Sequence, residues 1–113
     1  MALTPKPIAA GTLTNAVATF YTAAAAVKTR IDAFTVCNYS GSPATFTLWI
    51  VPSGGTAGDS NIVVKTRSIA AGASARVLES IGQWLLGGYT IQMQASANAA
   101  ITITASGIEQ TEN

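Results

Sequence analysis

Apolar and polar residues alternate with a period of two over most of this chain. In the segment Thr45–Val51, Phe46, Leu48 and Ile50 fall on one face, and Thr45, Thr47 and Trp49 fall on the other. This spacing is typical of a half-buried antiparallel strand, because successive side chains of a strand point to opposite faces. The same pattern indicates strands at Val17–Thr22, Lys28–Asn38, Ile62–Ile69, Ser74–Leu78, Ile91–Ser96 and Ile101–Ser106.

Two hairpins are predicted between strands that follow each other in sequence. One is expected to join the last two strands across Ala97–Ala99. The other is expected to join Ile62–Ile69 to Ser74–Leu78 through Ala70–Ala73, where Gly72 can adopt the positive φ that other residues resist. The pattern alone does not set the order of the remaining strands.

The ends of the chain and two short segments depart from the alternation. Residues 1–13 are expected to form an N-terminal arm or an edge strand, because Pro5 and Pro7 cannot donate to a strand ladder. Residues 110–113 lack apolar positions and are expected to be a short mobile tail. Ala23–Ala26 predicts a helical turn or a loop, and Glu79–Leu86 predicts one short helical turn.

These elements predict one all-β domain that spans residues 1–113. The length suits a single domain with its own core. Short strands separated by frequent turn signals are typical of an antiparallel β-sandwich. We therefore expect a sandwich of about seven or eight strands, with either a jelly-roll or an immunoglobulin-like topology.

The composition indicates self-association. Apolar residues make up 49% of the chain and charged residues only 10%, against roughly 25% charged residues in an ordinary soluble domain. Part of the surface is therefore expected to be buried against other subunits. The net charge is +1 and the basic residues are scattered, which argues against a nucleic-acid partner. Lys65 and Arg67 stand two residues apart and are expected to project from one face, as candidates for an interface or a ligand contact.

The chain is poor in residues that carry chemistry. It has no histidine, a single cysteine at Cys37 and five carboxylates on separate predicted elements. We therefore expect no enzymatic activity, no cofactor and no metal site. No segment reaches the ~20 apolar residues of a membrane-spanning helix, and the N-terminus has no leader pattern. The protein is expected to stay in a cytoplasm until it is assembled.

The two tryptophans and one glycine-rich turn are the remaining candidates. Trp49 shares a strand face with threonines, so it could pack within the fold, anchor an interface or stack on a ligand. Trp84 is expected in the core or at an interface. Gly54–Asp59 is expected to form a tight corner in which Asp59 accepts backbone N–H bonds. Cys37 is expected to be a small buried residue.

Several of these turns occur together in a known group of proteins. The run Cys37–Ser42 precedes the Thr45–Val51 strand, and Leu48–Asp59 continues it into the glycine-rich corner. In this combination the chain resembles small virion proteins of tailed bacteriophages. The resemblance extends from Phe20 to Glu109 and is strongest over Val36–Asn61; it departs at Ala24–Ala26, where the family has proline and glycine.

This resemblance implies a role in a virus particle. It predicts a capsid decoration or cement protein that self-associates, as a trimer, and binds the major capsid protein or another virion protein. A neck, tail or fibre component is one alternative. Another is a host-surface module that binds a glycan through Trp49 and the Gly54–Asp59 corner.

Overall fold

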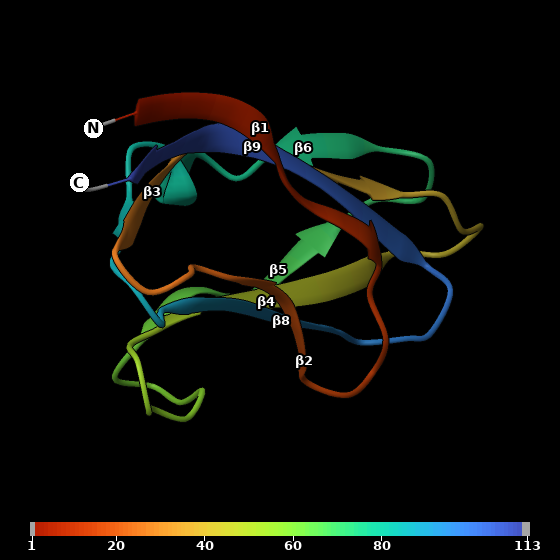
Figure 1. Cartoon of the computed structure of the whole chain (residues 1–113). Helices are drawn as coiled ribbons and strands as arrows, with labels where there is room; N and C mark the ends of the chain where they lie inside the picture. Colours follow the sequence, from red (N-terminus) through yellow and green to blue (C-terminus); the bar gives the residue numbers. More distant parts are fainter. Residues whose placement is uncertain (1, 112–113) are drawn as a thin grey trace.

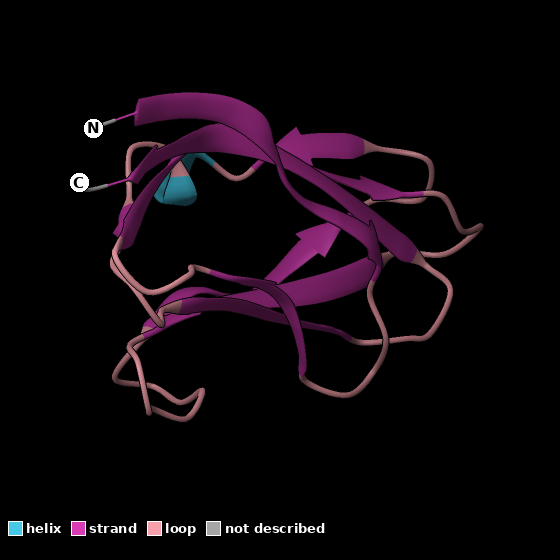
Figure 2. Ribbon diagram, in the orientation of Figure 1, coloured by secondary structure: helices cyan, strands magenta, loops and turns pink. Residues whose placement is uncertain are grey.

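The computed structural model describes residues 2–111, which form two antiparallel sheets packed face to face (Figures 1 and 2). The predicted all-β antiparallel sandwich is confirmed; within these residues there are nine strands, of which β7 is only two residues long. Sheet A contains β1 (Ala2–Thr12), β9 (Ile101–Thr111), β3 (Val27–Asn38) and β6 (Ser74–Arg76), with β7 (Trp84–Leu85) beside β3. Sheet B contains β2 (Ala18–Thr22), β8 (Thr90–Ala95), β4 (Ala44–Val51) and β5 (Ile62–Ile69).

The strand partners differ from the two predicted hairpins. β8 pairs with β2 and β4 in sheet B, whereas β9 pairs with β1 and β3 in sheet A. Likewise β5 pairs with β4, and β6 pairs with β3. Both predicted hairpins are therefore wrong, because the connections at 70–73 and 96–100 cross from one sheet to the other. The observed hairpin in this part of the chain joins β4 to β5.

The core forms from the faces that the alternation predicted. Ile91, Met93 and Ala95 of β8 are buried, as are Ile101, Ile103 and Ala105 of β9. Phe46 and Leu48 of β4 also belong to the core, whereas Ile50 is half-buried at its margin. Burial of these apolar faces between the sheets supplies most of the stability, at ~25 cal/mol per Å² removed from water.

The first and last described segments of the chain are strands of sheet A. β1 pairs with β9 along its length, so residues 2–12 form an edge strand and not a free arm. Gln110 and Thr111 pair with β1 and β3, which corrects the predicted tail at these two positions; residues 112–113 lie outside the described part. Between β2 and β3 the alanines form a turn, with Ala26 at φ 62°, and the predicted helical turn near residue 79 is the 3-10 turn η1 (Leu78–Ser80).

Candidate interaction surfaces

Large apolar side chains are exposed along the broken edge of sheet A, where β6, η1 and β7 follow each other in sequence and β6 and β7 both pair with β3. Among the described residues, four of the seven large apolar side chains that are clearly exposed lie within nine positions. We call these four the edge patch: Leu78, Ile81, Trp84 and Leu86. Clustered exposure of this kind marks a contact surface, whereas isolated exposed apolar residues are ordinary.

Trp84 is held in place by a guanidinium group. β7 pairs with β3 so that Trp84 lies opposite Arg30, and the Arg30 guanidinium stands 5.7 Å from the centre of the indole ring. Arg30 Nε also donates to Asp32 Oδ1 at 2.7 Å, and this contact raises the pKa of Arg30. The ring is 43% exposed. Trp84 is therefore not a core residue, and its place at an interface stays a prediction.

A hollow of about 360 Å³ adjoins the edge patch. It is lined by Asp32, Ala33, Phe34, Thr35, Arg76 and Ile81. β3 is bulged between Ile31 and Ala33, and the segment between β6 and β7 leaves the sheet as η1, so the strand row is interrupted here. The local sequence pattern does not reveal this surface, because the exposure of residues 78–86 depends on the interruption of the strand row.

Trp49 is almost completely buried on the outer face of sheet B. It lies opposite Gln92 of β8, away from the core cluster, and it is 8% exposed. Its indole Nε1 is buried without a hydrogen-bond acceptor, which costs about 1–3 kcal/mol. A sugar ring could stack on this indole only after the structure opened. The fold-packing environment predicted for Trp49 is therefore the one observed.

Lys65 and Arg67 do not share a face, contrary to the prediction. Arg67 lies opposite Phe46 and Val64 lies opposite Leu48, so two residues of β5, Lys65 and Thr66, oppose Thr47 alone. This β-bulge reverses the alternation. Lys65 is 68% exposed, with its Nζ 3.9 Å from an Asp59 carboxylate oxygen.

Arg67 instead reaches across the sandwich to η1. It donates to the carboxylate of Glu79, and this hydrogen bond lowers the pKa of Glu79, together with the Glu79 backbone N–H. The pair links the free edge of sheet B to the segment that carries the edge patch. It therefore helps to position the patch and is not part of a basic surface with Lys65.

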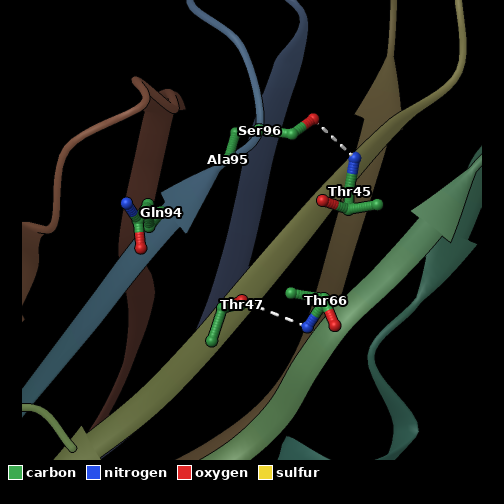
Figure 3. Close-up of a pocket in the computed structure, with 6 residues that line it drawn as sticks. All are labelled: Thr45, Thr47, Thr66, Gln94, Ala95 and Ser96. Atoms are coloured by element: carbon green, nitrogen blue, oxygen red, sulfur yellow. Dashed lines mark hydrogen bonds between the residues drawn. The ribbon is translucent and has the colours of Figure 1, made fainter.

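The same bulge shapes a shallow groove on the outer face of sheet B (Figure 3). The groove holds about 230 Å³ and is lined by Thr45, Thr47, Thr66, Gln94, Ala95 and Ser96. Thr66 has φ 45°, an unfavourable conformation for a β-branched residue, and its N–H donates to Thr47 Oγ1 at 3.1 Å. The Ser96 hydroxyl accepts the Thr45 N–H at 3.0 Å. These hydroxyl groups satisfy backbone donors at the sheet surface.

The glycine-rich corner is organised by Asn61, not by Asp59. Asn61 Oδ1 accepts the Gly58 N–H at 3.0 Å, and its Nδ2 donates to the Thr56 carbonyl at 2.9 Å. Asp59 extends into solvent towards Lys65. The predicted turn is present, but the asparagine two residues later supplies the capping oxygen, which corrects the role given to Asp59.

Asn38 is a buried hydrogen-bond centre that the sequence analysis missed. Its Nδ2 donates to the carbonyl oxygens of Ser42 and Ile69, and its Oδ1 accepts from the backbone and the hydroxyl of Ser40. These bonds connect the end of β3 to the end of β5. The adjacent Cys37 is a half-buried free thiol on the outer face of sheet A and not the core residue that was predicted.

A second polar cluster connects the sheets near the chain ends. Tyr21 Oη of β2 lies 2.7 Å from Thr29 Oγ1 of β3 and donates to Glu109 Oε2 of β9 at 2.5 Å. Lys6 Nζ of β1 lies 3.4 Å from the other carboxylate oxygen of Glu109. Burial, with the bond to Glu109, raises the pKa of Tyr21 to about 12. The cluster ties β1, β3 and β9 to β2.

Within residues 2–111, no group of three or more His, Cys, Asp or Glu side chains is arranged to hold a metal ion. No helix in the described range is long and apolar enough to cross a membrane.

Comparison with known proteins places the fold but not a family. The sequence matches no known protein family and no curated protein. The structure is similar to a chain of the disulfide-linked pili of Bacillus endospore appendages, with a TM-score of 0.57 and 18% identity over 98% of this chain and 89% of that one. It is also similar to a chain of infectious bursal disease virus, Gx strain, with a TM-score of 0.50 and 14% identity over 96% of this chain.

The match to the virus chain covers 31% of that chain, so this protein spans under a third of its length. At these identities the likeness shows the fold alone. The protein is therefore an all-β sandwich of a kind that occurs in a pilus and in a virus.

Proposed function

We propose that this chain is a non-enzymatic structural protein of a tailed-bacteriophage virion, namely a capsid decoration or cement protein. The edge patch carries the proposal, because apolar side chains exposed together on a chain with few charges indicate a protein–protein contact. The motifs of residues 37–42 and 48–59 support the phage assignment. The likeness to a pilus chain and a virus chain supports a role in an assembly.

The strand order supports a jelly-roll topology for this building block. The chain can be drawn as one long two-stranded antiparallel ribbon whose turn is the β4–β5 connection at residues 52–61. From its open end to this turn, the ribbon consists of the strand pairs β1·β9, β2·β8, β3·β6 and β4·β5. Rolling this ribbon brings β9 beside β3 and β8 beside β4, which produces the two sheets, and the short strand β7 is added beside β3 in sheet A. An immunoglobulin-like sandwich would instead place its first, second, fifth and fourth strands in one sheet.

The proposed partners are further copies of this chain and the major capsid protein or another virion protein. The resemblance favours a trimer, and it places the protein in the virion after assembly in the host cytoplasm. The alternative is a neck, tail or fibre component. The two positions differ in copy number, because a head lattice repeats a site far more often than a tail does.

Copy counting by mass spectrometry, together with cryo-electron microscopy of the assembled phage, tests this proposal. Hundreds of copies ordered on the shell are expected for a decoration protein. A dozen copies or fewer at one vertex or along the tail would move the protein to the neck, tail or fibre. Its absence from purified particles would contradict a virion role altogether.

A further inference from the structure

We infer that the edge patch and the adjoining hollow form a two-fold interface that binds a second copy of this chain. The inference rests on the self-association proposed above and adds the surface; its two-fold symmetry gives a dimer in place of the trimer that the resemblance favours. A two-fold contact uses the same patch on both subunits, so the patch must be complementary to itself in shape and in charge.

The shape of this surface offers a projection beside a recess. Leu78 is 66% exposed at the start of η1, immediately after Val77, whose N–H donates to the Phe34 carbonyl at 2.9 Å. Phe34 and Ile81 line the hollow together with the charged side chains of Asp32 and Arg76, so the exposed leucine stands next to a recess with an apolar part and a charged part. A cavity of ~150 Å³ holds a benzene molecule, so the hollow of about 360 Å³ has room for a leucine side chain from another copy.

The charges of the hollow are also self-complementary. Arg76 and Asp32 both line it. Within residues 2–111, no carboxylate lies within ion-pair distance of Arg76, and the bond between Asp32 and Arg30 uses Oδ1, which leaves Oδ2 for a second cation. A two-fold axis through the hollow would place Arg76 of each copy opposite Asp32 of the other.

Other described carboxylates are a poorer match for Arg76. Asp59 faces Lys65, Glu79 binds Arg67, and Glu109 faces Lys6 while it accepts from Tyr21. Each already has a cation from its own chain, as Asp32 has Arg30, but of these carboxylates Asp32 is the one that lines the hollow together with Arg76. Asp32 of a second copy is thus the partner that combines charge with the adjoining apolar surface, and the observations favour a copy of this chain over an unrelated protein.

The first experiment compares two exposed leucines. Leu78→Glu places a charge in the proposed interface, whereas Leu3→Glu changes a leucine of similar exposure, 62%, at the far edge of sheet A. Sedimentation equilibrium over a range of concentrations measures the dissociation constant of each variant. Leu78→Glu is expected to raise it by roughly thirtyfold or more, the effect of losing a central interface side chain. Leu3→Glu is expected to leave it unchanged.

The second experiment tests the symmetry by exchanging charges. Arg76→Glu places like charges opposite Asp32 twice in a dimer, and Asp32→Lys does the same opposite Arg76. Each variant alone is expected to be monomeric. Mixing the two restores both attractions, so native mass spectrometry should detect the heterodimer and neither homodimer. Circular dichroism of each variant checks that the fold is retained.

The outcomes separate this inference from the proposed function. A wild-type oligomer that survives Leu78→Glu, or a mixture of the charge variants that stays monomeric, would overturn the two-fold interface while self-association stands. A wild-type chain that is monomeric at all concentrations but abundant on the phage head would overturn the interface and leave the decoration role intact. Loss of association in Leu78→Glu, with recovery in the charge-swapped mixture, would support it.

Discussion

The two edges of sheet A are built in opposite ways. On one side, β1 is a single strand of 11 residues that pairs with β9, with one bulge between Pro7 and Ala9. On the other side, β6 and β7 contribute three and two residues, separated by η1. The long edge offers backbone groups, whereas the broken edge offers the apolar side chains of the edge patch.

The long edge is protected against pairing with another strand. The Leu13 N–H donates to the Ile101 carbonyl, so the backbone of Leu13 faces β9. Backbone groups of successive residues in a strand point alternately towards and away from the neighbouring strand, and the extra residue in the bulge between Pro7 and Ala9 shifts this alternation by one. Pro5 and Pro7 therefore have their backbone nitrogens on the side away from β9. An ordinary residue at either position would point an N–H outwards. Proline has no N–H, so these two donors are missing from the exposed edge.

This difference favours one mode of contact for the proposed self-association. Strand addition needs a continuous row of donors and acceptors, and the prolines interrupt that row on β1. The broken edge has few unpaired backbone groups, but its apolar side chains Trp84 and Ile81 lie near Arg30 and Arg76, respectively. The two edges therefore favour an association in which side chains of the broken edge make the contact and β1 pairs with no further strand.

The largest expected effect on stability comes from Gly107→Ala, because Gly107 lies in β9, the strand that joins β1 at the long edge to β3 beside the broken edge. Gly107 lies in β9 opposite Lys6 of β1 and Ile31 of β3, and an added Cβ would collide with the Arg30 carbonyl oxygen. The backbone would have to shift, so we expect a loss of about 3 kcal/mol in the free energy of unfolding. Urea denaturation measures it. Gly41→Ala is the matched control, because no heavy atom lies within 4 Å of its added Cβ. Equal effects in the two variants would contradict this account.

A smaller loss is expected for Asn38→Ala, which acts on the broken edge alone. The change leaves the Ser42 and Ile69 carbonyl oxygens without their donor in a buried site and frees the connection that leads from β5 to β6. We expect about 2 kcal/mol of destabilisation. Hydrogen exchange should show faster exchange in β6 than in β1. Uniform acceleration in both strands would mean that Asn38 does not anchor this edge specifically.

The faces of the strands could be predicted from the sequence, but their partners could not. The alternation of apolar and polar residues indicates which side chains are buried, and it correctly predicted the core residues of β8 and β9. Sequence neighbours nevertheless lie in opposite sheets at the β5–β6 and β8–β9 connections, because the pairing follows a ribbon closed at residues 52–61. Nothing in a local pattern distinguishes a hairpin from a crossing between sheets.

The candidate surfaces were predictable only in part. Trp84 was singled out as a core or interface residue, and it lies in the edge patch. The bulge at Thr66 could not be foreseen, and it places Lys65 and Arg67 on opposite faces. The contact between Tyr21 and Glu109 joins residues 88 positions apart, so no local signal reveals it.

Tyr21→Phe is expected to destabilise the protein less than Asn38→Ala, by weakening the polar cluster that connects the long edge of sheet A to β2. The variant removes the hydroxyl that links Thr29 and Glu109, and Glu109 is also the carboxylate that faces Lys6 of β1. We expect a loss of about 1.5 kcal/mol in the free energy of unfolding at neutral pH. Thermal denaturation measures the difference. A change confined to β6 in hydrogen exchange would contradict the assignment to the long edge.

The pH dependence gives an independent check on Tyr21. Its folded pKa of about 12 lies above the ordinary value of 10.0, so the folded state keeps a proton that the unfolded state loses. The contribution is complete below about pH 10 and is lost as the pH rises through about 12. The stability difference between wild type and Tyr21→Phe should therefore shrink over this range. A difference that is constant from pH 9 to pH 12 would contradict the raised pKa.

The smallest effect on stability, and the sharpest test of the two edges, is expected for Pro5→Thr combined with Pro7→Thr. Both positions are exposed on β1, so the free energy of unfolding should change by about 0.5 kcal/mol or less. The two new N–H groups complete the outward row of donors, and sedimentation velocity should detect larger species that grow with concentration. Pro43→Thr, in the turn before β4, is the control. The new association should persist when Leu78→Glu is added, because it uses the opposite edge; if Leu78→Glu abolished it, the two edges would not be independent surfaces.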